Sequence, residues 1–200
     1  ALITGAGREP ARALALALAG TGCRLALNDL TPLRLDETAA QARALGAQVS
    51  THVGDPSKGL FARGLLEEAL EAWDHINVMV NCPLAEPRLS LIDLDEWDFQ
   101  RTLEANTGGP FLLIQLLSRW LQAEGRPGTI LNLITAPPAV PLQPGREAFY
   151  TSQMALSALT ASAAPGLSPL GIRVYGISAG ERQAQAAAAQ ALGLLDPLCP

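Results

Sequence analysis

Basic residues and long apolar runs are both scarce in this chain. Its 14 Lys and Arg stand against 19 Asp and Glu, which gives a formal net charge of -5 without any basic cluster. Such a charge balance argues against nucleic acid or an anionic membrane as a partner. No apolar run approaches the ~20 residues of a transmembrane helix, and no signal-peptide pattern is present. We therefore expect a soluble, cytoplasmic protein.

Cysteine and histidine are too few to support several kinds of site. Cys23, Cys82 and Cys199 are odd in number and far apart, so they indicate neither a disulfide framework nor a zinc site. His52 and His75 are the only histidines, which disfavours a metal centre and a His-based catalytic triad. The 200 residues, 48 % of them hydrophobic, are instead typical of one domain with an ordinary buried core.

The first twenty residues predict a strand, a glycine turn and a helix. Residues 1–3 are apolar, the turn at 4–7 contains Gly5 and Gly7, and the leucine-rich helix that follows ends at Gly20. In α/β domains this arrangement directs free backbone N–H groups and a helix N-terminus at a phosphate. The first segment of the chain therefore predicts a nucleotide-binding turn.

That turn is incomplete. The pattern Gly-x-Gly-x-x-Gly requires glycine where the chain has Pro10, and the wider pattern Thr-Gly-x-x-x-Gly-x-Gly requires glycines at Glu9 and Ala11. Glu9 brings a carboxylate toward the place of two negative phosphates, Pro10 removes an N–H group, and Ala11 adds a methyl group. We expect these three residues to weaken phosphate binding.

Strands and helices alternate regularly along the rest of the chain. Strands are expected near residues 1, 24, 48, 76, 129 and 172, with a helix between each pair. This predicts an α/β fold with a Rossmann-like doubly wound parallel sheet in three α/β/α layers, as a single domain over 1–200. The pattern begins inside a strand and shows none after Ile177, so the chain is ragged at both ends and one interpretation is a fragment lacking the last strand.

Three polar residues are expected at the carboxyl edge of this sheet. Asp29 lies about twenty residues after the glycine turn, where an acid accepts ribose hydroxyls. Its alternative role is a turn former or helix cap before Pro32. Thr135 ends a strand and Tyr150 begins a helix, so a hydroxyl and a phenol could polarise a carbonyl there. The alternative for Tyr150 is an aromatic side chain packed under the Pro-rich loop at 136–145.

The spacing G-x-S-x-G at 176–180 is typical of the nucleophile elbow of α/β-hydrolases. That mechanism requires a histidine later in the chain, and none follows Ser178. The sequence therefore disfavours an esterase.

Several segments follow the order and approximate spacing of one known family. They are TGAG at 4–7, Asp29, GDPS at 54–57, VMVNCPL at 78–84, Asn106, GTILNLIT at 128–135, FYTSQMAL at 149–156 and GIRVYGISAG at 171–180. On these segments almost all of the chain resembles the short-chain dehydrogenase/reductase family. The resemblance implies an NAD(P)-dependent oxidoreductase of alcohols or ketones. In such enzymes a hydride passes between nicotinamide and a carbinol carbon, while a Tyr, helped by Ser, Lys and Asn, handles the proton.

The resemblance implies three catalytic positions and one departure from them. Tyr150 takes the place of the proton donor, Thr135 that of the serine that bonds the substrate oxygen, and Asn106 that of the structural asparagine. Met154 stands where the Tyr-x-x-x-Lys pattern has its lysine, which holds the nicotinamide ribose and supplies a positive charge to the tyrosine. Arg146, one turn before Tyr150, replaces that charge only if it points toward the phenol.

The resemblance also implies cofactor-binding positions, while the scarcity of histidine and cysteine predicts no metal site. These positions are Gly5, Gly7, Asp29, Asp55 and Asn81. In the family, the acid at Asp29 favours NAD over NADP, and the acid at Asp55 contacts adenine. From the residues alone, Asp55 is also expected to be the N-cap of the helix that follows it. The expected cofactor is NAD(H), if any is bound.

We favour a catalytically impaired member of this family that acts as a non-catalytic or regulatory subunit with an active homologue. The alternative is a working NAD(H)-dependent alcohol dehydrogenase or ketone reductase that uses Tyr150 and Thr135. A binding module for another small ligand is a third hypothesis. Family members commonly pair through two long helices, here 95–123 and 149–164, so a homodimer, a tetramer or a hetero-oligomer is expected. The leucines of these helices could equally face their own sheet.

Overall fold

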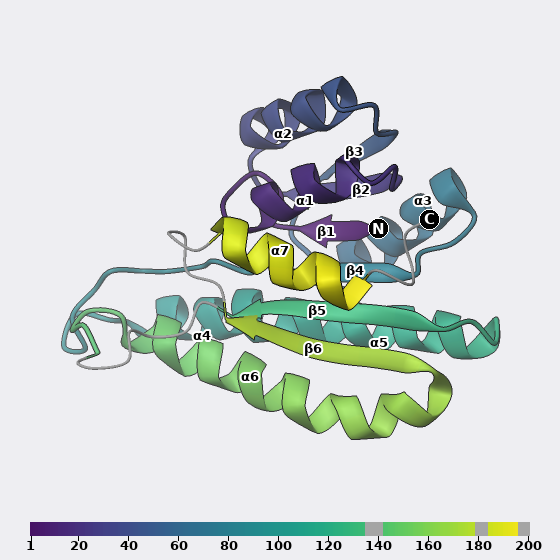
Figure 1. Ribbon diagram of the computed structural model, residues 1–200. Coiled ribbons are helices and arrows are strands. Elements are labelled where there is room, and N and C mark those ends of the chain that lie inside the picture. The colour runs from purple at the N-terminus through teal and green to yellow at the C-terminus, as the bar shows by residue number, and fades with distance from the viewer. Residues whose placement is uncertain (135–141, 179–183, 196–200) are drawn as a thin grey trace.

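Figure 1 shows the computed structural model of this chain, which describes residues 1–134, 142–178 and 184–195. Six parallel strands form one sheet in the order β3-β2-β1-β4-β5-β6. The strands are β1 (Leu2–Thr4), β2 (Leu25–Asp29), β3 (Val49–Val53), β4 (Val78–Asn81), β5 (Gly128–Ile134) and β6 (Ile172–Ser178). The chain runs outward from β1 to one edge and then from β4 to the other, so the predicted doubly wound parallel sheet is confirmed.

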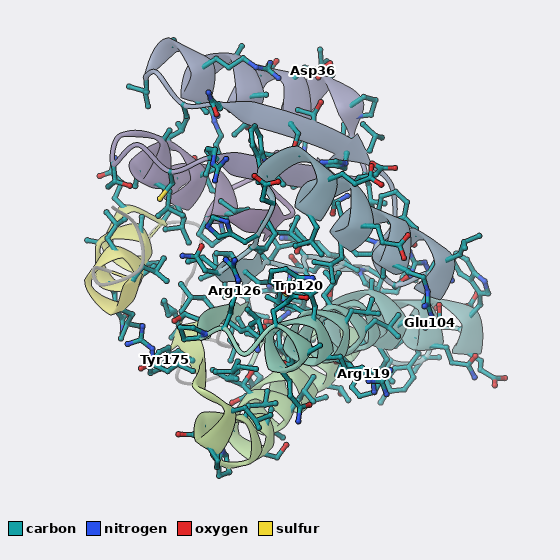
Figure 2. The ribbon with its side chains drawn as sticks, turned by 90° about the vertical axis from the view of Figure 1, so that its right-hand side faces the viewer. Asp36, Glu104, Arg119, Trp120, Arg126 and Tyr175 are labelled. Atoms are coloured by element: carbon teal, nitrogen blue, oxygen red, sulfur yellow. The ribbon has the colours of Figure 1, made fainter. Side chains whose placement is uncertain are left out.

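Helices cover both faces of this sheet. They are α1 (Ala11–Ala19), α2 (Pro32–Ala44), α3 (Gly59–Trp73), α4 (Glu96–Leu103), α5 (Gly109–Ala123), α6 (Glu147–Leu167) and α7 (Ala184–Leu195). One buried cluster joins the sheet to α1, α2 and α7, and a second joins it to α3, α5 and α6. Trp120 of α5, labelled in Figure 2, packs against the second cluster. The predicted three-layer arrangement is therefore confirmed.

Burial of the central strands explains why their sequences are typical of a parallel sheet. Every residue of β1, β2, β4 and β5 is buried, because helices cover both faces of these strands. At the edges, β3 and β6 are only partly buried. The polar residues Asn28, Asp29 and Asn81 therefore stand out as buried polar groups at the carboxyl ends of apolar strands.

The long helix expected at 95–123 is present, with one feature that the sequence did not predict. It is divided into α4 and α5 by a π-helical turn, η1 (Glu104–Gly108), which contains the buried Asn106. Asp95 caps α4 by accepting a hydrogen bond from the N–H of Asp98. A π turn inserts a residue into the helical repeat, and such turns are frequent at functional sites. Among the helices described here, none is long and apolar enough to cross a membrane.

Candidate functional site

A cavity of about 430 Å³ opens at the carboxyl ends of β1, β2 and β4. Residues 82–87, which follow β4, form one wall, and α4 contributes Asp98, Arg101 and Thr102 to the lining. Gly5, Asp29 and Asp55 also line the cavity. The order of strands reverses at β1 and β4, so this is the switch point at which ligands bind in doubly wound sheets.

The two glycines of the turn are needed by the protein's own packing. Gly5 has a φ of +67°, and a Cβ atom there would lie 2.3 Å from the carbonyl oxygen of Cys82. A Cβ atom on Gly7 would lie 3.0 Å from a carboxylate oxygen of Asp29 and 2.9 Å from the Cβ of Arg34. Only glycine fits at Gly5 without moving the backbone after β4. These glycines would therefore be required even if no nucleotide were bound.

The carboxylate of Glu9 lies at the N-terminus of α1. Its Oε2 accepts a hydrogen bond of 3.1 Å from the backbone N–H of Ala13. The first N–H groups of a helix carry partial positive charge and have no partner within the helix, so they attract anions. Glu9 thus occupies, with its own negative charge, the kind of position that binds phosphate in nucleotide-binding domains.

The remaining N–H groups at the start of α1 also donate within the chain. The N–H of Arg12 donates to the carbonyl of Arg8 at 2.8 Å, and that of Leu14 donates to the carbonyl of Pro10 at 3.3 Å. The N–H of Ala11 donates to the sulfur of Cys82. Pro10 has no N–H group to offer. A phosphate at this helix terminus would therefore have to displace existing bonds.

Cys82 contributes a neutral, buried thiol to the cavity wall. Its side chain is 2 % exposed, and burial raises its pKa to about 12, although the hydrogen bond from the N–H of Ala11 acts in the opposite direction. The nearby carboxylates of Asp29 and Glu9 raise the pKa further. Because the thiolate is the nucleophilic form, this cysteine is not an activated nucleophile.

Asp29 holds two turns together. Its Oδ2 accepts from the N–H of Gly7 at 2.9 Å, and its Oδ1 accepts from the N–H of Thr31 at 2.8 Å. Thr31 immediately precedes α2, so the expected role of Asp29 as a turn former is confirmed. A carboxylate has about four lone-pair positions, so each oxygen can still accept a bond from a ligand in the cavity. Its expected role as a ribose ligand stays a prediction.

The sequence predicts that Asp55 is the N-cap of α3, and this prediction is wrong. The helix begins at Gly59, after Lys58, and Asp55 instead accepts bonds of 2.9 Å and 2.7 Å from the N–H and hydroxyl of Ser57. Its other oxygen pairs with Arg101 of α4. Burial opposes ionisation, but the bonds from Ser57 and the charges of Arg101 and Lys58 outweigh it and lower the pKa of Asp55.

Asn106 fixes the wall that follows β4. Its Oδ1 accepts from the N–H of Ala85 at 2.8 Å, and its Nδ2 donates to the carbonyl of Ala85 and to the hydroxyl of Ser152, both at 2.8 Å. The side chain is fully buried. Its contacts are those of a structural asparagine, since they join η1, the wall and α6; any catalytic part stays a prediction.

Asn81, expected to bind cofactor, lies in a buried polar chain. Its Nδ2 donates to Oδ1 of Asn132 at 2.9 Å, and Asn132 donates to the hydroxyl of Thr160 at 2.8 Å. These bonds join β4, β5 and α6 through otherwise apolar packing. Asn81 is fully buried and is not among the residues that line the cavity.

Arg146 points toward the phenol of Tyr150. The hydroxyl of Tyr150 accepts bonds of 3.4 Å from Nη1 of Arg146 and 3.3 Å from the N–H of Gln143. The guanidinium lies 5.1 Å from the centre of the Tyr150 ring and 4.8 Å from that of Phe149, and it pairs with Glu86. Tyr150 itself is 7 % exposed and is not among the residues that line the cavity.

Met154 is 47 % exposed and lies in a different hollow, between α6 and β6. That hollow also contains Thr160, Tyr175 and Ser178. Thr135, the expected partner of Tyr150, lies outside the residues that the structure describes. Within the described part of the chain, no group of three or more Cys, His, Asp or Glu side chains could hold a metal ion.

Sequence reasoning missed two ion pairs at this site. Arg101 pairs with Asp55, and Glu86 pairs with Arg146. The partners are 46 and 60 residues apart in the chain and belong to no motif, so nothing in the sequence relates them. The one weak indication of these ion pairs in the sequence is that charged residues cluster near Asn106 and Tyr150.

A doubly wound parallel sheet with a glycine turn and an acid at its switch point defines the class of nucleotide-binding α/β domains. Within that class, the family described as Enoyl-(Acyl carrier protein) reductase matches residues 5–193. A short-chain dehydrogenase/reductase of Hericium erinaceus, eriH, is 32 % identical over 86 % of this chain and 69 % of its own length. An uncharacterized oxidoreductase of Thermotoga maritima is 28 % identical over 92 % of this chain and 72 % of its own length. The chain belongs to the short-chain dehydrogenase/reductase family.

Solved structures agree with this assignment. NAD+-bound xylitol dehydrogenase is 31 % identical and superposes with a TM-score of 0.80, over 88 % of this chain and 68 % of that one. A metagenomic short-chain oxidoreductase in complex with NADP has a TM-score of 0.86 at 23 % identity, over 97 % and 89 % of the two chains, which shows the shared fold. A nicotinamide dinucleotide is therefore a cofactor of this family.

The residues of this chain do not fit a pyrophosphate at the start of α1. The N–H groups of Ala11, Arg12 and Ala13 already have acceptors within the chain, and one of those acceptors is the carboxylate of Glu9. A pyrophosphate there would meet the like charge of Glu9 and would compete with the existing bonds of these N–H groups. The other half of the site, around Asp29, remains open as part of the cavity.

Proposed function

We propose that this chain is a short-chain dehydrogenase/reductase that does not catalyse efficient hydride transfer. It serves instead as a non-catalytic or regulatory subunit beside an active homologue in the cytoplasm. The observation that carries this proposal is the hydrogen bond from the N–H of Ala13 to the carboxylate of Glu9, which places a fixed negative charge where a dinucleotide needs donors. Weak cofactor binding removes the hydride source before any proton chemistry begins.

The position of Met154 supports the same proposal. Family resemblance places a lysine there to hold the nicotinamide ribose, but Met154 carries no charge and lies in the hollow between α6 and β6. The loss of phosphate donors and the loss of the ribose ligand act on the same cofactor. Either change alone weakens binding of the nicotinamide cofactor, and the two together leave little affinity for it.

Exposed apolar side chains on the long helices support a role as a subunit. Trp97 of α4 and Phe111 of α5 are 69 % and 45 % exposed, and Met154 of α6 is also open to solvent. Large apolar side chains that are exposed on a surface are candidates for a protein interface. We propose that residues 95–123 and 149–164 pack against a partner, either a second copy or a homologue.

A working NAD(H)-dependent reductase is the second candidate, and one observation favours it. The guanidinium of Arg146 lies 3.4 Å from the hydroxyl of Tyr150, so a positive charge is present although Met154 supplies none. In a reductive reaction, Tyr150 donates a proton to the developing alkoxide while Thr135 bonds the same oxygen.

A calorimetric titration with NADH, and then with NADPH, tests the proposal. We expect no binding heat at millimolar nucleotide, and no oxidation of NADH with a panel of ketones. A short-chain dehydrogenase known to be active, titrated under identical conditions, is the positive control. Micromolar binding together with ketone-dependent oxidation of NADH would overturn the proposal and favour the reductase.

A further inference from the structure

Ser50, His52 and Glu68 form a hydrogen-bonded chain away from the cavity described above. Nδ1 of His52 lies 2.8 Å from Oε2 of Glu68 on α3, and Nε2 of His52 lies 3.0 Å from Oγ of Ser50. Ser50 and His52 are two residues apart on β3, so their side chains lie on the same face of the sheet. The scarcity of histidine disfavours a triad in the sequence, but a triad needs only one histidine.

The direction of each hydrogen bond follows from the chemistry of its partners. A carboxylate only accepts, so Nδ1 of His52 carries the hydrogen atom that it donates to Glu68. In the neutral imidazole the other nitrogen, Nε2, then carries no hydrogen atom, and the hydroxyl of Ser50 donates to it. This is the tautomer, and these are the two bonds, by which an acid, a histidine and a serine act together in acyl transfer.

The three side chains differ in their exposure to solvent. The side chain of His52 is 8 % exposed, which restricts its ring, whereas that of Glu68 is 64 % exposed. Ser50 is partly exposed on β3, the strand at one end of the sheet. The base is therefore held in place while a reactant can reach the nucleophile from solvent.

The edge of β3 supplies a hydrogen-bond donor beside Ser50. The N–H of Gly54, just after β3, donates to β2, and the direction of the peptide groups alternates along a strand. The peptide groups of Thr51 therefore face away from β2, toward the edge. As this alternation predicts, the side chain of Arg43 reaches the carbonyl of Val49 at that edge, at 3.0 Å. The N–H of the residue after a nucleophilic serine is a known donor to the oxyanion in acyl transfer.

We propose that Ser50 and His52 hydrolyse small carboxylic esters at this edge of the sheet, and that Glu68 positions His52. The hydroxyl oxygen of Ser50 attacks the carbonyl carbon, its proton passes to Nε2 of His52, and the N–H of Thr51 donates to the oxyanion. The bond to the alcohol oxygen then breaks, and His52 gives its proton to the departing alkoxide. Water, deprotonated by the same nitrogen, attacks the acyl-serine, which releases the carboxylic acid and restores Ser50. This activity goes beyond the proposed function and does not depend on nucleotide binding.

Covalent labelling tests the nucleophile on the unchanged chain. A fluorophosphonate transfers its phosphonyl group to an activated serine oxygen and releases fluoride, and peptide mass spectrometry locates the adduct. We expect the adduct on Ser50. Ser90 is the internal control, because its exposed hydroxyl donates to the carboxylate of Asp93 rather than to a histidine. No adduct on Ser50, or equal labelling of Ser90, would overturn the proposal.

Hydrolysis of p-nitrophenyl acetate by three variants tests the reaction itself. Ser50→Ala should lower the rate at least about tenfold. Glu68→Gln keeps an acceptor for Nδ1 of His52 but removes the charge, so the rates of hydrolysis and of labelling should both fall at least about tenfold, with the unfolding midpoint in urea unchanged. Glu67→Gln, also exposed on α3, makes the same change in net charge and should leave both rates as they are. Hydrolysis that Ser50→Ala does not slow, or equal rates in the two α3 variants, would refute the assignment.

Discussion

Replacing Asn106 by alanine removes three hydrogen bonds, two of which hold the wall after β4. Two of them, each 2.8 Å, satisfy the N–H and carbonyl of Ala85. The third goes to Ser152, whose hydroxyl keeps its own bond to the carbonyl of Phe149 at 2.7 Å. The main cost is therefore two backbone groups of Ala85 left without partners.

Each unsatisfied buried group costs about 1–3 kcal/mol, and water entering beside the partly buried Ala85 lowers the sum. We expect Asn106→Ala to reduce the free energy of unfolding by about 3 kcal/mol. For a domain of this size, that corresponds to a fall in melting temperature of about 6–12 °C. Urea denaturation followed by tryptophan fluorescence measures the loss. Gln100→Ala, on the exposed surface of α4, is the control and should stay within about 0.5 kcal/mol of the unchanged protein.

Hydrogen exchange provides a second readout that is specific to the wall. The amide of Ala85 should exchange faster in Asn106→Ala, because its acceptor is Oδ1 of Asn106. A loss of stability below about 1 kcal/mol, or an unchanged exchange rate at Ala85, would refute the reasoning.

Three further predictions concern other parts of the molecule. Gly5→Ala should lower the free energy of unfolding in urea by about 3 kcal/mol or more, since its Cβ would overlap a backbone carbonyl. Gly22→Ala, also at positive φ but in open space, should lower it by about 1 kcal/mol. The lowered pKa of Asp55 stabilises the fold above the ordinary carboxyl pKa of 3.8, so the unfolding midpoint should fall as pH drops below that value, and less so in Arg101→Met. Phe111→Glu should dissociate an oligomer in light scattering, and a molecular mass that this change leaves the same would argue against the proposed interface.

The fold was predictable because its signals are local and repeat along the chain. Apolar runs such as residues 76–80 and 129–134 alternate with amphipathic segments, and the parallel sheet follows from that alternation. The π turn within the expected helix at 95–123 was not predictable. The apolar pattern continues through the π turn, and the bonds from Asn106 to Ala85 and Ser152 that accompany the turn join segments far apart in the sequence.

The glycines of the turn have two explanations. Gly5 and Gly7 were predicted to bind cofactor, which stays a prediction, and the structure also gives each a reason that involves only the protein: the carbonyl of Cys82 and the carboxylate of Asp29. A glycine pattern indicates that a side chain would clash at that position, but it does not show whether the neighbouring atoms belong to the protein or to a ligand. The direction of Glu9 was equally hidden, because a side chain before a helix points either to the free N–H groups or to solvent.

An internal carboxylate at a phosphate site also changes how the fold is stabilised. Where the first N–H groups of a helix have no acceptor within the protein, they gain one when a dinucleotide binds. A ligand present at a hundred times its Kd then adds about 2.7 kcal/mol to the free energy of unfolding. Here Glu9 supplies the partner of Ala13 permanently, so that part of the gain is present without a ligand. The melting temperature should therefore be the same with and without millimolar NADH, while an active relative is stabilised. Such independence from the cofactor is what a subunit with a structural or regulatory task requires.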